Sequence, residues 1–151
     1  MLIAMACTSI LKHGFMMRKD RTVMRGGGVC VMAKKHLRVM PVSLADEFCS
    51  LEMLCFDLSL TANYVFFVLY RPPPLDAEAV SYMRLLVQCL SRYESNKYPS
   101  VIVGDLNLPK INWHTCTGFD NDVYMLFLSY VIESSYIQLV TFPHMMLTFL
   151  M

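Results

Sequence analysis

The residues best suited to chemistry follow a short apolar run in the last third of the chain. Val101 to Val103 lead into Gly104, and Asp105 and Asn107 come directly afterwards. An Asp and an Asn two apart at the end of a strand can point the same way, so that the carboxylate accepts a proton while the amide orients an oxygen or a metal ion. The alternative is an Asx turn, in which both side chains bond only to the backbone. These residues alone leave both interpretations open.

The elements that must position Asp105 follow the order strand, helix, strand. The continuous apolar run from Tyr64 to Tyr70 predicts a buried strand, which Pro72 to Pro74 end because proline cannot continue a ladder. Asp76 is expected to cap a helix that ends near Ser95. Its apolar residues recur at three- and four-residue steps, namely Ala79, Met83, Leu86, Val87 and Leu90. This order predicts an α/β fold with a parallel or mixed sheet, in which functional groups gather beyond the strand ends.

Other segments add to this prediction. Strands are expected from Val29 to Ala33, from Glu47 to Ser59 and from Ile137 to Thr141, and a second helix from Asn121 to Glu133. Arg25 to Gly28 is expected to be a turn, because three successive glycines supply positive φ values. It is not a phosphate-binding loop, since neither Gly-Lys-Ser/Thr nor GxGxxG is present there.

Composition narrows the class of protein. The chain has 151 residues, 56% of them hydrophobic and 17% charged, which predicts one globular domain and excludes global disorder. No apolar run reaches the roughly 18 residues of a membrane span. The six cysteines form no CxxC pair, so free thiols in a reducing compartment are expected. The first apolar stretch has its positive charges after it, which favours a nuclear or cytoplasmic location over secretion.

Charge is unevenly distributed along the chain. Residues 1–38 carry eight Lys and Arg against one Asp (net +7), and the remainder carries five against eleven acids (net −6), within a total of +1. Such a basic segment can bind a phosphate backbone, because local potential steers a polyanion more than total charge does. Solvated charges around a turn would give the same count.

Four stretches, taken together and in order, resemble a known family. They are Arg18 to Arg21 with Arg25 to Val29, Val68 to Pro73, Val103 to Trp113, and Leu139 to Pro143. They are similar to the basic hairpin, the Tyr-Arg-Pro-Pro strand end, the Gly-Asp-Phe-Asn signature and the Thr-x-Pro element of the endonuclease/exonuclease/phosphatase superfamily, specifically the endonuclease domain of non-LTR retrotransposons. The resemblance covers about residues 15–143 and predicts that residues 1–151 form a single, incomplete domain of this kind.

The resemblance implies a partial DNase I-like two-sheet α/β sandwich that hydrolyses DNA phosphodiester bonds with Mg²⁺ or Mn²⁺. By motif match Asp105 would orient or activate water, Asn107 would hold the phosphate and metal environment, and Tyr70 would hydrogen-bond the phosphate. Asp105 and Asn107 would be the metal ligands. A metal cation, a carboxylate and neutral donors are the groups that such a transition state needs. The residues expected to contact nucleic acid are Arg18, Lys19, Arg21, Arg25 and Arg71.

The chain also departs from the family pattern. Residues 1–17 contain no acid, so the upstream metal-binding Glu is missing, and no Ser-Asp-His element follows Pro143. His144 has no adjacent Asp and is not taken as catalytic. Because groups that act as a unit are strongly non-additive, catalysis is predicted to be impaired. A domain truncated at both ends would also expose sheet edges, and self-association through them is expected.

Two further hypotheses come from other classes. The chain could be a non-catalytic nucleic-acid-binding remnant that uses the basic segment 18–38, in which case its affinity should fall steeply with salt. It could also be an inactive fragment that is misfolded or embedded in a partner, which would show no cooperative melt.

Overall fold

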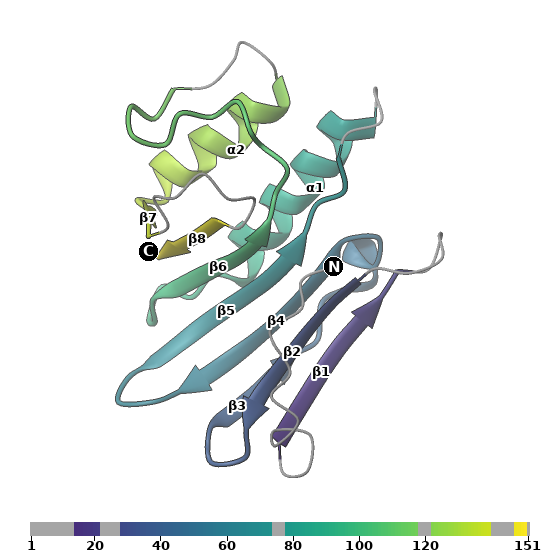
Figure 1. Cartoon of the computed structure of the whole chain (residues 1–151), viewed down its shortest axis with the longest axis vertical. Coiled ribbons are helices and arrows are strands. Elements are labelled where there is room, and N and C mark those ends of the chain that lie inside the picture. The colour runs from purple at the N-terminus through teal and green to yellow at the C-terminus, as the bar shows by residue number, and fades with distance from the viewer. Residues whose placement is uncertain (1–13, 22–27, 74–77, 118–121, 140–146, 151) are drawn as a thin grey trace.

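The structure is a computed structural model that describes residues 14–21, 28–73, 78–117, 122–139 and 147–150. Its elements are β1 (Gly14–Asp20), β2 (Gly28–Lys34), β3 (Arg38–Val42), the short 3₁₀ helix η1 (Asp46–Phe48), β4 (Glu52–Ser59), β5 (Asn63–Tyr70), α1 (Glu78–Tyr93), β6 (Ser100–Asp105), α2 (Asp122–Glu133), β7 (Ile137–Gln138) and β8 (Leu147–Leu150). The strands form a two-stranded sheet, β1-β2, and a six-stranded sheet in the order β3-β4-β5-β6-β8-β7 (Figure 1).

The centre of the large sheet is built from β4, β5 and β6. A tight hairpin joins β4 to β5 in antiparallel register, and β6 lies parallel to β5 after the crossover through α1. A parallel neighbour needs such a crossover, and central parallel strands are buried on both faces. This explains why β5 and β6 are the most continuously apolar strands of the chain.

Both helices cover one face of this sheet. Their buried residues, among them Met83, Leu86 and Phe127, form one cluster with the inward-facing residues of the strands, such as Phe67 and Ile102. The three- and four-residue spacing of the helix residues gives each helix one apolar stripe. This cluster is the main hydrophobic core.

The small sheet lies over the other face, where β2 contacts β4 and β5, and β1 contacts β4. On the large sheet, the rings of the paired residues Phe56 and Phe66 stack with centroids 5.3 Å apart and planes 8° apart. The fold is therefore an α/β sandwich of two sheets with two helices on the outer face of the larger one (Figure 1).

The structure confirms most predicted elements and corrects others. The strand predicted from Glu47 begins only at Glu52, because Phe48 is buried from the turn of η1 and mimics the alternation of a strand. The last predicted strand is shorter, since β7 is only Ile137–Gln138 and residues 140 and 141 lie outside the described part, as do residues 25–27 of the predicted turn. Within the described residues, no helix is long and apolar enough to cross a membrane.

Candidate functional site

Three polar side chains share one rung of the large sheet. Tyr70, the last residue of β5, pairs with Glu52 on β4 and with Asp105 on β6. Residues paired across neighbouring strands point to the same face, and their chain neighbours Met53 and Leu69 belong to the core on the opposite face. Tyr70 and Asp105 are half-buried. The rung therefore lies on the side of the small sheet, at the end where β5 and β6 finish.

Gly104 allows β6 to come close enough to β5 to form this rung. Its φ is +159°, and a Cβ atom at this position would lie 1.8 Å from the carbonyl oxygen of Leu69, which no side chain can occupy. Glycine is therefore required at the residue before Asp105.

Asp105 and Asn107 form a tight turn beyond β6. The backbone N–H of Asn107 donates to Oδ1 of Asp105 at 3.0 Å, and Asn107 has a φ of 48°. The side-chain amide of Asn107 donates to the carbonyl oxygen of Arg71 at 2.5 Å. The structure thus contains the Asx turn that the sequence left as an alternative. The turn commits Oδ1 of Asp105 and one amide hydrogen of Asn107 to the backbone.

Arg71, the residue directly after β5, holds this turn. Its side chain is 2% exposed, and Nη1 donates to the carbonyl oxygens of Leu106 at 2.9 Å and Asn107 at 3.2 Å. Its backbone N–H donates to the carbonyl oxygen of Asp105 at 2.8 Å. Burial lowers the pKa of Arg71. We therefore assign Arg71 a structural role in shaping the turn and leave it out of the set of residues proposed to contact nucleic acid.

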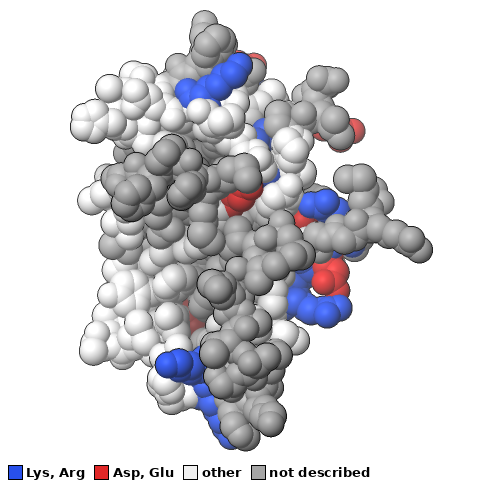
Figure 2. Space-filling model, in the orientation of Figure 1, with Lys and Arg blue, Asp and Glu red and all other residues white. Residues whose placement is uncertain are grey.

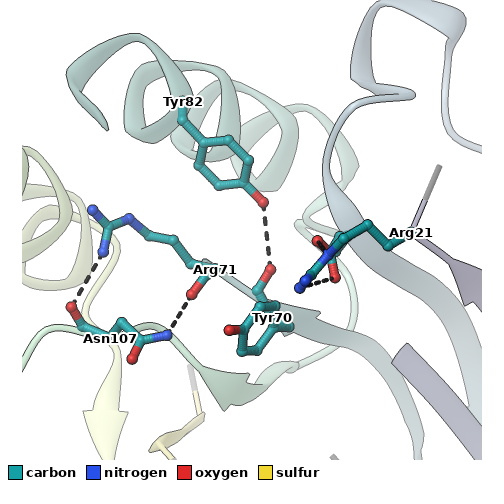
Figure 3. Close-up of polar contacts among 6 residues, drawn as sticks. Arg21, Tyr70, Arg71, Tyr82 and Asn107 are labelled. Carbon is teal, nitrogen blue, oxygen red and sulfur yellow. Dashed lines mark hydrogen bonds and ion pairs between the residues drawn. The ribbon is translucent and has the colours of Figure 1, made fainter. Parts of the chain in front are cut away.

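Tyr70 is held by contacts on its backbone and on its ring. The hydroxyl of Tyr82, on α1, donates to the carbonyl oxygen of Tyr70 at 3.4 Å, and burial raises the pKa of Tyr82 to about 12. The guanidinium carbon of Arg21 lies 5.3 Å from the centroid of the Tyr70 ring. Figure 3 shows Tyr70 between Arg21 on one side and the Arg71–Asn107 pair on the other.

Glu52 is a candidate site residue that sequence reasoning missed. It is 8% exposed, and its carboxylate accepts hydrogen bonds from Nε and Nη2 of Arg21 at 2.6 and 3.2 Å. These bonds raise the pKa of Arg21. A signal existed, because the tight turn after Ser59 sets the register of the hairpin, and counting back from it pairs Glu52 with Tyr70.

The other predicted basic residues are placed less centrally. Arg18 is on the exposed side of β1 and forms an ion pair with Asp20 at 2.7 Å, whereas Lys19 and Arg21 are half-buried on the inner side. Arg25 lies outside the described residues. Figure 2 shows Lys and Arg side chains in separate groups on the face in view, some of them beside acidic side chains. Of the predicted basic residues that the structure describes, Arg21 is the one that reaches the Tyr70 ring.

We call the strand end formed by Tyr70, Asp105 and Asn107 the rim. It offers too few oxygen ligands for a complete divalent-cation site. Mg²⁺ and Mn²⁺ prefer several oxygen ligands, especially carboxylates. Asp105 offers one carboxylate with one oxygen already in the turn, Asn107 offers its amide oxygen, and the Glu52 carboxylate is paired with Arg21. Across the described ranges, no three His, Cys, Asp or Glu residues are grouped to hold a metal ion. The described residues therefore do not by themselves fit the cation that the resemblance implies.

The arrangement of the sheets and helices defines the fold class of the protein. The two sheets and two helices of the described residues have the DNase I-like α/β fold of endonuclease/exonuclease/phosphatase proteins. No protein-family model matches the chain, and no curated protein matches it in sequence.

Two solved structures with this fold are similar to the chain. One is the endonuclease domain of TRAS1, a telomere-specific non-LTR retrotransposon, with a TM-score of 0.57 and 14% identity over 89% of this chain and 64% of that one. The other is an endonuclease/exonuclease/phosphatase protein from Beutenbergia cavernae, with a TM-score of 0.56 and 13% identity over 95% of this chain and 47% of that one. The chain thus spans less than two thirds of either relative.

Proposed function

We propose that the rim formed by Tyr70, Asp105 and Asn107 binds a phosphodiester of DNA, and that the chain is an endonuclease-type domain whose hydrolytic step is impaired. The observation that carries this proposal is the pairing of Tyr70 with Asp105 on one rung, with the Arg21 guanidinium over the Tyr70 ring. A hydroxyl donor, a carboxylate and a cation in one place suit a phosphate and an attacking water.

Each residue has a proposed role that its surroundings permit. The Tyr70 hydroxyl would donate to a phosphate oxygen, and Arg21 would neutralise charge on the same group. Asp105 would accept a hydrogen bond from the attacking water through Oδ2, because Oδ1 is used in the turn. Asn107 would keep the turn in shape and present its amide oxygen beside Asp105.

Impairment is proposed because of the donor set. Mg²⁺ or Mn²⁺ would neutralise phosphate charge and lower the pKa of water when bound in such a site. Asp105 and Asn107, the ligands that the motif match implies, supply only one carboxylate and one amide oxygen. The affinity for the cation is therefore expected to be low, and the rate of DNA hydrolysis is expected to be low as a result.

A plasmid-nicking assay with Mg²⁺ or Mn²⁺ tests the proposal. We expect slow nicking that Asp105→Ala reduces by about 10²-fold or more. Asp46→Ala, at an exposed position in η1, is the matched control and should leave the rate unchanged. Rapid nicking by the wild type would refute impairment, and equal rates for wild type and Asp105→Ala would refute the site.

A second test measures DNA binding by two variants with substitutions at opposite ends of β5. Tyr64 and Tyr70 lie on the same face of β5, at opposite ends. Tyr70→Phe should weaken binding of a short duplex, and Tyr64→Phe should not. Absence of binding by the wild type at low salt would refute the proposed function.

The second candidate function is a non-catalytic nucleic-acid-binding remnant that uses segment 18–38. The exposed side chain of Arg18 and the half-buried Lys19 on β1 favour it. In that case neutralising Arg18 and Lys19 should reduce affinity and its salt dependence, with no effect of Asp105→Ala on either binding or nicking.

A further inference from the structure

The ion pair between Arg21 and Glu52 joins the two sheets at the edge of the rim. Arg21 directly follows β1, and Glu52 begins β4. The guanidinium meets the carboxylate side-on, with Nε–Oε1 at 2.6 Å and Nη2–Oε2 at 3.2 Å, and the two side chains are 19% and 10% exposed. A bidentate contact of this kind fixes the plane of the guanidinium as well as its distance.

Glu52 occupies only some of the donors of Arg21, and hydrogen bonding to the Tyr70 side chain also raises the pKa of Arg21. An arginine has donors on Nε, Nη1 and Nη2, and Glu52 engages Nε and Nη2. The Nη1 donors are not used by this carboxylate, while the guanidinium carbon lies over the Tyr70 ring. By contrast, Nη1 of Arg71 is taken up by two carbonyl oxygens in the buried turn.

We propose that Glu52 is a positioning residue that holds the Arg21 guanidinium over Tyr70, so that Arg21 and the Tyr70 hydroxyl bind the same DNA phosphate. This inference rests on the proposed function of the rim. Glu52 does not itself touch the phosphate. It acts through Arg21, and the shared rung with Tyr70 sets where Arg21 is held.

The sign of one effect separates this role from simple repulsion between Glu52 and DNA. Removing a negative charge close to a polyanion should strengthen binding if the charge only repels DNA. If Glu52 positions Arg21, neutralising Glu52 should instead weaken DNA binding. The guanidinium of Arg21 would then rotate freely and lose its preorganised contact with the phosphate.

The experiment measures anisotropy of a labelled DNA duplex with the full chain over a series of salt concentrations. We expect Glu52→Gln to weaken affinity about fivefold and Arg21→Ala about tenfold, with the double variant no weaker than Arg21→Ala alone. Both single variants should lower the slope of log affinity against log salt by about one phosphate contact. A merely structural residue would leave that slope unchanged.

A matched ion pair elsewhere on the chain supplies the control. Glu47 and Arg92 form an exposed pair, so Glu47→Gln also removes one acidic partner of an arginine. The affinity of the Glu47→Gln variant for DNA should equal or exceed that of the wild type.

The outcomes distinguish the inference from the function on which it rests. If Arg21→Ala weakens binding but Glu52→Gln does not, the positioning role is overturned and the proposed function stands. If the wild type does not bind, or if Arg21→Ala and Tyr70→Phe both bind as the wild type does, both are overturned. Where Glu52→Gln does not fold, Arg21→Lys keeps the charge but loses the bidentate geometry; wild-type affinity of that variant would overturn the role, and a loss like that of Arg21→Ala would support it.

Discussion

Replacing Arg71 with alanine should destabilise the domain by about 3.6 kcal/mol. The change removes two hydrogen bonds from a charged donor to the carbonyl oxygens of Leu106 and Asn107, worth about 1 kcal/mol each after desolvation. It also removes two buried methylene groups at about 0.8 kcal/mol each. For a chain of this size the melting temperature should fall by roughly 7–14 °C.

Urea unfolding followed by circular dichroism measures this change. Arg71→Met keeps most of the apolar stem and should lose about half as much stability, which separates packing from hydrogen bonding. Arg92→Ala, an exposed arginine in an ion pair, is the control and should change stability by less than about 0.5 kcal/mol. A loss below about 1 kcal/mol for Arg71→Ala, or wild-type stability for Arg71→Met, would refute the proposed contribution of these contacts.

Limited proteolysis gives a local measurement of the same turn. Lys110 is exposed a few residues beyond the two carbonyl groups that Arg71 holds. Trypsin should cleave after Lys110 faster in Arg71→Ala than in the wild type, by more than global stability explains, because the turn opens locally. Equal cleavage rates, after correction for global unfolding, would show that Arg71 does not restrain the turn.

Four other perturbations have defined outcomes. Gly104→Ala should cost more than about 3 kcal/mol or prevent folding, because its Cβ would overlap a carbonyl oxygen; a wild-type melt would contradict the close approach of β5 and β6. Burial raises the pKa of Cys89 to about 12 from 9.0, so its contribution to stability is complete below pH 9 and is lost as pH rises towards 12. Cys89→Ala should therefore make the decline in stability with pH shallower by about 1.4 kcal/mol per pH unit in that window, and an unchanged slope would show that the thiol titrates normally. Tyr130→Phe removes the hydroxyl that contacts Glu94 and should cost about 1 kcal/mol in urea unfolding; no change would mean that this contact adds nothing. Ile137 is 67% exposed on β7, and Ile137→Lys should lower any concentration-dependent mass seen by light scattering; a wild-type monomer at all concentrations would refute self-association.

Local sequence pattern predicted the elements that carry the rim. The run from Tyr64 to Tyr70 forms β5, and the apolar residues before Asp105 form β6. Both strands are largely buried, because continuous β-branched and aromatic residues fit a sheet that is covered on both faces. Helical spacing placed α1 and α2 within a few residues of their bounds. The start of β4 was wrong, since Phe48 has the apolar character of a strand residue but is buried by a 3₁₀ turn.

The composition of the rim was harder to predict, because it depends on register between strands. The sequence singled out Asp105 and Asn107 because they are adjacent to a recognisable strand end, and their role in a site stays a prediction. Glu52 was missed because its importance comes from its partners Tyr70 and Arg21, which are distant in sequence. Arg71 was expected to face nucleic acid, and no local signal indicates that its guanidinium turns inwards to backbone oxygens.

The hydrogen bonds from Arg71 to backbone oxygens have a consequence for how the sequence of this loop can diverge. Every amino acid at positions 106 and 107 offers the same carbonyl group, so substitutions there do not remove the acceptors. A loop held in this way can therefore keep its backbone conformation while its side chains change. In a lineage that has lost activity, preserved shape beside the strand ends is a weaker sign of a working enzyme than the identity of the side chains themselves.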